Sequence, residues 1–210
     1  MLLSDDLPVF SVSDVIGQQG DFVTVEITLE SNPGIVAGGV EVLYDAKYLR
    51  LTNAVDTGLL SGAVFGNTME QMPYRLTWEA GTDADTTACG VVARLTFEIL
   101  AEGRHEVSLT AYRGHSFNLE PVIFGTASGK IYADVLADYD EDTGSVTVES
   151  LPEGVLVMAT AYEGGRMIWV GEAVHTETLA VPQLAEADEL LLFFLWEDWK
   201  PAGTCRDLLS

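Results

Sequence analysis

The sequence predicts an all-β protein made of two β-sandwich domains. Many short runs alternate apolar and polar residues with the period of two that a half-buried strand requires. Glycine, proline and asparagine clusters interrupt these runs at regular intervals, as turns between strands do. Apolar residues make up 48% of the 210 residues, which is enough for a buried core. Many short strands with no long helical pattern are typical of a β-sandwich.

Residues 22–29 show the alternation most clearly. Four aliphatic side chains, from Val23 to Leu29, occupy every second position, and threonine or glutamate stands between them. One face of this strand therefore belongs in a core and the other faces outward. The same pattern predicts further strands at residues 40–44, 74–78, 92–100, 106–111 and 130–135.

An acidic run marks a domain boundary. Asp138 to Asp142 includes four acidic residues and is followed by Gly144. It lacks the ligand order of an EF-hand calcium loop, so we interpret it as a solvated linker. Strand patterns resume at residues 145–149, 155–162, 167–174, 176–181 and 189–196. We therefore predict two domains, residues 1–136 and residues 137–210, and the second is large enough to fold alone.

The charge excludes several classes of partner. The chain has 33 acidic and 10 basic residues, a formal net charge of −23. Nucleic acid is excluded because phosphate binding needs lysine and arginine to release counterions. Anionic membrane surfaces are disfavoured for the same reason. The longest apolar run, residues 190–196, is much shorter than the ~18 residues of a membrane-spanning helix, so we predict no membrane insertion.

The sequence carries no recognisable catalytic or metal-binding motif. His105, His115 and His175 are scattered, whereas metal sites usually have two ligands at short spacing. There is no G-x-S-x-G elbow and no glycine-rich phosphate loop. We predict a protein that is not an enzyme and that needs no cofactor and no metal; a paired-carboxylate glycosidase is a distant alternative. Cys89 and Cys205 fit no C-x-x-C spacing, so one disulfide and two free thiols both stay open.

Several aromatic residues leave a second class of function open. Tyr74, Trp78, Trp169, Trp196 and Trp199 could stack on sugar rings if they were exposed and coplanar. Such a platform would make the chain a carbohydrate-binding module. Trp78 and Trp196 lie in alternating strands, where packing in the core is the commoner arrangement.

An ordered series of motifs over residues 8–136 resembles the cohesin family, and this series covers about three-fifths of the chain. The motifs are Gly20-Asp21 before Val23-Thr24-Val25, Tyr44-Asp45, Arg75-Leu76-Thr77-Trp78, Gly90 before Ala93–Ile99, and Gly129-Lys130-Ile131. Cohesins typically have a proline after the tyrosine and aspartate, and Ala46 replaces it here. The resemblance implies a nine-stranded jelly-roll β-sandwich without catalytic activity.

The resemblance also implies a binding face. In cohesins one flat sheet face receives a dockerin, a small pair of helices that carries calcium. By alternation, the outward residues on the corresponding strands are Ala37, Gly39, Glu41 and Leu43, then Arg75, Thr77 and Glu79 on the neighbouring strand, and Val92, Arg94 and Thr96 beyond it. In many cohesins asparagine and aspartate stand where Ala37 and Gly39 stand here, so this chain departs from the family on the face that would bind.

The end of the chain resembles a second group of proteins. Residues 155–162 and the ending Phe193-Phe194-Leu195-Trp196-Glu197-Asp198-Trp199-Lys200-Pro201 look like small immunoglobulin-like β modules of secreted bacterial proteins. Together the two resemblances imply an extracellular or cell-surface adaptor, in polysaccharide-degrading or cell-surface assemblies, that binds a dockerin-containing protein. The alternative is a carbohydrate-binding module that binds polysaccharide directly through exposed aromatics.

Overall fold

The computed structural model confirms an all-β chain. It describes residues 7–32, 34–60, 63–65, 68–79, 87–112, 114–116, 118–182 and 186–209. Regular secondary structure in these ranges is β-strand, and they contain no helix that is long and apolar enough to cross a membrane. Contacts between residues divide the chain into an N-terminal unit, Met1–Asp14 with Gln19–Ile131, and a C-terminal unit, Val15–Gln18 with Tyr132–Ser210.

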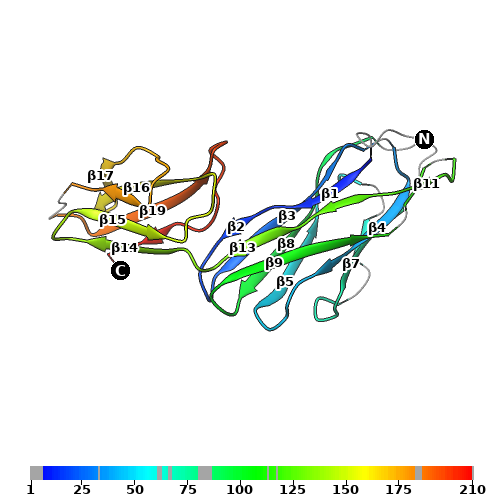
Figure 1. Cartoon of the computed structure of the whole chain (residues 1–210), viewed down its shortest axis with the longest axis horizontal. Helices are drawn as coiled ribbons and strands as arrows, with labels where there is room; N and C mark the ends of the chain where they lie inside the picture. The colour runs from blue at the N-terminus through cyan, green and yellow to red at the C-terminus, as the bar shows by residue number, and fades with distance from the viewer. Residues whose placement is uncertain are drawn as a thin grey trace. The chain divides into compact units, whose positions relative to one another are not determined.

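The strands of the N-terminal unit form two sheets (Figure 1). The first has the order β12 (Gly125–Ala127), β1 (Val9–Val12), β3 (Phe22–Glu30), β8 (Gly90–Ile99) and β5 (Leu49–Asp56). The second contains β6 (Ala63–Phe65), β7 (Tyr74–Glu79), β4 (Ala37–Leu43), β9 (Arg104–Ala111) and β13 (Gly129–Tyr132), with β10 (Gly114–His115) and β11 (Pro121–Val122) extending it. This is the β-sandwich that the alternating runs predict.

The core of the N-terminal unit lies between these sheets. The predicted inward residues of β3, from Val23 to Leu29, are all buried. Three rings join the two layers: the Phe10 ring centroid lies 5.2 Å from those of Trp78 and Phe124, and the latter two are 5.9 Å apart. Tilted aromatic contacts of this kind add to the stabilisation from burial alone. The sandwich therefore holds β4 and β7 in a fixed position.

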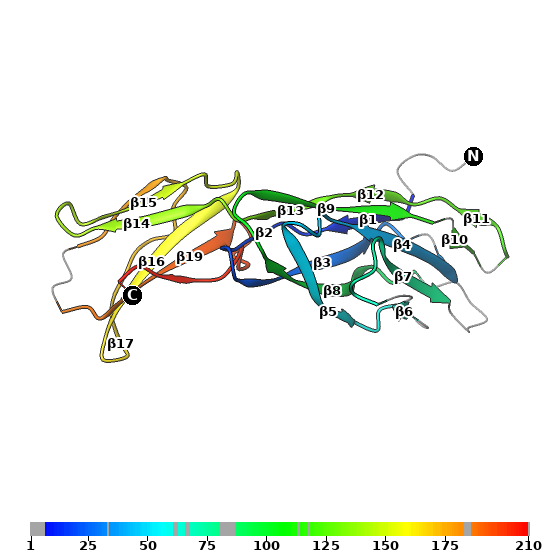
Figure 2. The same cartoon turned by 90° about the horizontal axis from the view of Figure 1, so that it is seen from below.

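The C-terminal unit is also two-layered (Figure 2). One sheet has the order β14 (Leu136–Asp140), β15 (Ser145–Glu149) and β18 (Thr178–Ala180). The other has the order β17 (Arg166–Val170), β16 (Val155–Glu163), β19 (Glu189–Trp196) and β20 (Arg206–Asp207). A short strand from early in the sequence, β2 (Val15–Ile16), belongs to this unit: the Ile16 amide donates to Ala202 O at 2.6 Å, and Ile16 is fully buried in its core.

The acidic run 138–142 is not the linker that its composition suggests. It forms the end of β14 and the turn that leads into β15. Asp140 Oδ1 accepts hydrogen bonds from the amides of Asp142 and Thr143, at 2.9 and 3.2 Å. An aspartate that bonds to the backbone two residues later stabilises a tight turn, and the sequence composition does not distinguish this use from a linker.

Candidate protein-binding face

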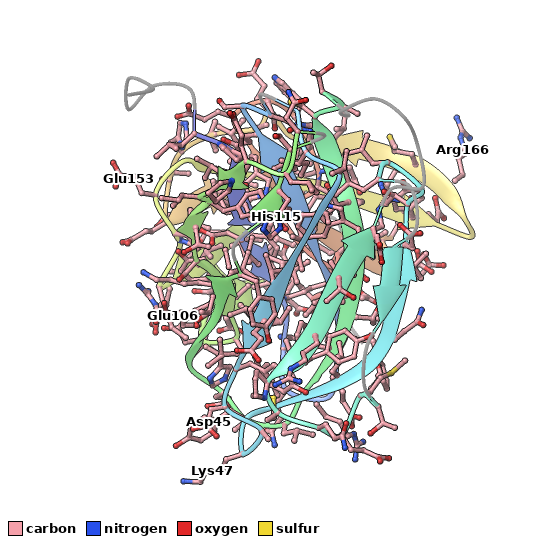
Figure 3. The ribbon with its side chains drawn as sticks, turned by 90° about the vertical axis from the view of Figure 1, so that its right-hand side faces the viewer. Asp45, Lys47, Glu106, His115, Glu153 and Arg166 are labelled. Atoms are coloured by element: carbon pink, nitrogen blue, oxygen red, sulfur yellow. The ribbon has the colours of Figure 1, made fainter. Side chains whose placement is uncertain are left out.

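Strand β4 lies at the centre of the candidate site, with β7 along one edge and β9 along the other. Its register places Glu41 opposite Arg75 on β7 and opposite Thr110 on β9. Residues directly opposite in an antiparallel pair share a face, so these side chains lie on the outer side of the sheet. We call this surface the β4 face. Figure 3 shows the unit with side chains drawn as sticks. Glu106 lies on β9, the strand beside β4, and His115 lies higher in the view.

A hydrogen-bonded cluster occupies the middle of the β4 face. Arg75 Nε donates to Glu41 Oε1 at 3.0 Å, and the Tyr112 hydroxyl donates to the same oxygen. Tyr112 follows β9, and its amide donates to Gly39 O at 2.8 Å. The Tyr112 hydrogen bond, aided by the Arg75 guanidinium, lowers the pKa of Glu41 below its usual value. Glu41 is therefore ionised and held in one orientation.

Glycine at position 39 makes room for the Tyr112 ring. A Cβ placed on Gly39 would lie 3.0 Å from Tyr112 Cδ2 and 2.9 Å from Thr77 Cγ2. The position is buried even though it faces outward, because Tyr112 and Thr77 cover it. Ala37 is half-buried on the same face. Tyr112 thus lies across the strand at Gly39.

The end of β4 offers an apolar anchor point. Leu43 is 37% exposed and Met72 is 40% exposed, and both line a shallow hollow with Glu106 and Ser108. The turn that follows is fixed by Asp45, whose carboxylate accepts from the Lys47 amide at 2.9 Å. Figure 3 shows Asp45 and Lys47 in this turn, at the lower edge of the unit. Exposed apolar side chains beside fixed polar groups are the pattern of a protein-binding surface.

Three of the predicted face residues are not on the β4 face. Val92, Arg94 and Thr96 belong to β8, which pairs with β3 and β5 in the other sheet. Arg94 Nε donates to Glu26 Oε1 at 2.9 Å, and the Thr96 hydroxyl lies 3.0 Å from that of Thr24. The prediction that β8 lies beside β7 is wrong, because alternation shows which residues face outward and does not show which sheet a strand joins.

Val92 does not face outward at all, since it is only 4% exposed. The register between β3 and β8 pairs Ile27 with Ala93 and Thr28 with Val91. Val92 is therefore the extra residue of a β-bulge, and a bulge shifts the alternation by one position. The remaining predicted residues, Arg75, Thr77 and Glu79, lie beside β4 on β7 as the strand pattern indicates.

Strand β9 contributes residues that the prediction left out. Thr110 lies opposite Glu41 and Ser108 lies opposite Leu43. With Glu106 and Tyr112 they continue one alternating series along the strand and just beyond it. The signal is present in the sequence, because Glu106, Ser108 and Thr110 are the polar positions of the alternating run at residues 106–111. What was missing was the position of that strand beside β4.

The aromatic residues considered for a sugar platform are mostly in the cores. Tyr74 and Trp78 are 1% and 4% exposed, and Trp169 and Trp196 are partly buried against the core of the C-terminal unit. Trp199 is 65% exposed. A line of exposed, coplanar rings is therefore not formed by these five residues.

The other candidate groups are not assembled into a reactive site. His105 Nε2 lies 2.8 Å from Ala101 O, and His175 Nδ1 lies 3.1 Å from Val155 O. In the described part of the chain, histidine, cysteine and acidic residues form no group that could hold a metal ion. Cys89 and Cys205 are exposed free thiols.

Comparison with known proteins gives no sequence-level match, since neither a protein-family model nor a curated protein matches the chain. Solved structures do match. The OlpA cohesin from a complex with a dockerin, from Clostridium thermocellum, has 14% identity and a TM-score of 0.54, over 60% of this chain and 98% of that chain. The sixth cohesin of Acetivibrio cellulolyticus scaffoldin B, in complex with the Cel5 dockerin, has 21% identity and a TM-score of 0.54, over the same shares.

A third match comes from outside the cellulosome. It is a non-cellulosomal cohesin from the hyperthermophilic archaeon Archaeoglobus fulgidus, with 13% identity and a TM-score of 0.51, over 60% of this chain and 89% of that chain. At sequence identities this low, the structural matches establish the fold alone. The cohesin resemblance drawn from the motifs is confirmed at that level, and about three-fifths of this chain has the cohesin fold.

Proposed function

We propose that the chain is a non-catalytic binding protein whose N-terminal unit binds a dockerin-bearing protein through the β4 face. The observation that carries the proposal is the composition of that face. It combines the exposed apolar pair Leu43 and Met72 with a preorganised polar cluster around Glu41. Two of the structures that share the fold are cohesins in complex with dockerins, which supports the same class of partner.

The arrangement suits a helical partner. At Gly39 the partner would meet the Tyr112 ring, because that ring and Thr77 cover the glycine. Leu43 and Met72 provide the apolar contact on which most of the binding energy would depend, since a few anchors dominate protein interfaces. Arg75, fixed by Glu41, and the free edge of the Tyr112 ring then provide directional contacts around it.

The proposed setting is an extracellular or cell-surface assembly, in which this chain is the adaptor. The partner's dockerin would carry the calcium, and the β4 face would need none of its own. Binding should therefore depend on calcium only through the folding of the partner.

Calorimetric titration tests this proposal. A panel of purified dockerin modules is titrated into the full chain, once with calcium and once with chelator, and an unrelated EF-hand protein serves as the control. At least one dockerin should bind in calcium and lose binding in chelator, and the control should not bind. If no dockerin binds, or if the captured dockerin binds equally well in chelator, the proposal is wrong. Retention on insoluble polysaccharide without dockerin binding would favour the carbohydrate-binding alternative.

A further inference from the structure

The sheet formed by β17, β16, β19 and β20 in the C-terminal unit is apolar on both faces. Its inner face is part of the core, because Val157 lies opposite Phe194 and both are buried there. The intervening positions must face the other way, since neighbouring residues of a strand point to opposite sides. These outer positions are Leu156, Met158, Thr160 and Tyr162 on β16, Leu191, Phe193 and Leu195 on β19, and Met167 and Val170 on β17. We call them the outer strip.

The outer strip presents hydrocarbon and sulfur to the surface over much of its length. Met167 is 49% exposed and Val170 is 54% exposed on β17, and Met158 and Phe193 are partly exposed on β16 and β19. Thr160 is the polar residue near its centre, but its hydroxyl is buried beneath its neighbours. Figure 2 shows β16 and β19 side by side, with β14 and β15 in the other layer of the unit.

The sequence of β19 shows the same feature. Glu189 is followed by Leu190-Leu191-Leu192-Phe193-Phe194-Leu195-Trp196, which is apolar at every position. A continuous apolar run is typical of a strand that is covered on both faces. Within the described residues, the sheet of β14, β15 and β18 covers the inner face only. Partly exposed apolar residues that adjoin one another on a sheet face commonly mark an interaction site.

The acidic residues around the outer strip indicate the kind of partner that would cover it. Glu189 lies opposite Tyr162 and Asp207 lies opposite Leu191, so both acids share the outer face. Glu197 and Asp198 follow β19 at its other end, where Lys200 is paired with Asp198 at 2.6 Å. Residues 137–210 contain 15 acidic and 3 basic residues, a net charge of −12.

This charge argues against a second copy of the chain as the occupant. Two outer strips packed against each other would bring acidic borders together at close range, which like-charge repulsion opposes. A partner with lysine or arginine around an apolar centre would instead satisfy both parts of the surface.

We infer that the outer strip is a second protein-docking site, and that it binds an amphipathic partner segment whose apolar side is bordered by lysine or arginine. The site lies in the C-terminal unit and uses none of the residues of the β4 face. The inference can therefore be tested independently of dockerin binding.

Synthetic peptides test this inference on the full chain. An amphipathic helix of leucine and lysine is titrated by fluorescence anisotropy. A leucine–glutamate helix of the same pattern and a serine–lysine peptide of the same charge serve as comparisons. The leucine–lysine helix should bind, and the other two should bind at least about tenfold more weakly, because each lacks one of the two complementary features. Equal binding of the serine–lysine peptide would overturn the inference, since charge alone would then explain it.

Matched substitutions locate the site. Phe193→Thr removes the centre of the strip and should weaken the leucine–lysine helix about tenfold. Leu136→Thr changes a 52% exposed apolar residue on β14 of the same unit and should leave binding unchanged. If Phe193→Thr fails to fold, Met158→Thr replaces it. If the folded variant bound the leucine–lysine helix unchanged, the site would be refuted. The site would also be refuted if the unmodified chain formed a concentration-dependent dimer that this variant abolished.

Discussion

Glu41 is the residue on which the geometry of the β4 face depends. Its carboxylate accepts from both Tyr112 and Arg75, and the resulting pKa lies below the usual value of 4.5. A lowered folded-state pKa contributes stability that is present above pH 4.5 and is lost as the pH falls through the folded value. Acid should therefore loosen the cluster before it affects the apolar anchor of Leu43 and Met72.

The contribution of Tyr112 to the pKa of Glu41 can be tested by substitution. The Tyr112 hydrogen bond is the largest single cause of the lowering, so Tyr112→Phe should move the Glu41 pKa back towards 4.5. Carboxyl chemical shifts followed by NMR during a pH titration measure this directly. Tyr48→Phe is the control, since Tyr48 lies beside Lys47 and His105. An unchanged Glu41 pKa in Tyr112→Phe would contradict the hydrogen bond described for Tyr112.

At the scale of the elements, close packing accounts for the glycine in the motif Gly129-Lys130-Ile131. A Cβ on Gly129 would lie 2.6 Å from the carbonyl oxygens of Val12 and Ser13, which are backbone atoms and cannot move aside cheaply. The adjacent Lys130 amide donates to Asp14 Oδ1 at 2.7 Å. The start of β13 is thus held tightly against the segment that follows β1.

Gly129→Ala should therefore destabilise the N-terminal unit by about 1–3 kcal/mol, the usual cost of overpacking. Gly125→Ala is the matched control, because its Cβ would meet the flexible Val9 side chain at 3.3 Å. Urea unfolding of both variants gives the comparison. Equal stabilities would show that the close approach at Gly129 is relieved by a small backbone movement.

Element by element, the sequence predicts strands and facing residues better than it predicts sheet membership. The alternation in β3, β4 and β7 correctly separates inward from outward positions, because a core on one face of the sheet directly dictates that pattern. It fails at Val92, where a bulge adds one residue, and it carries no information on which sheet β8 joins. Those two facts depend on pairing between strands far apart in the chain, and so the predicted face included the wrong third strand in place of β9.

At the scale of the whole molecule, four early residues belong to the second unit. Val15–Gln18 lie in the C-terminal unit, and Ile16 is one of its fully buried side chains. Arg206, itself 6% exposed, donates to Val135 O at 2.5 Å and to Gly17 O at 3.5 Å. A domain boundary drawn from composition alone does not detect this, because a two-residue strand leaves no pattern in the sequence.

The C-terminal unit should accordingly depend on Ile16. Ile16→Ala should cost it about 2–5 kcal/mol, since a buried isoleucine leaves a cavity when truncated. Hydrogen exchange separates the two units: protection of the β16 amides should fall while that of the β3 amides holds. Ile27→Ala, a matched change in the core of the N-terminal unit, should give the opposite result. Unchanged protection of β16 in Ile16→Ala would show that this unit is complete without the early segment.

The central claim, that the β4 face binds the dockerin, is tested most directly by comparing the two outer faces of the N-terminal unit. Leu43→Asp places a charge on the β4 face, and Phe22→Asp makes the same kind of change on β3 of the other sheet, at a residue that is 60% exposed. Both are titrated against the dockerin that the unmodified chain binds in calcium. We expect Leu43→Asp to weaken binding at least about tenfold and Phe22→Asp to leave it unchanged. Unchanged binding by Leu43→Asp, with loss in Phe22→Asp, would place the dockerin on the opposite sheet and contradict the account.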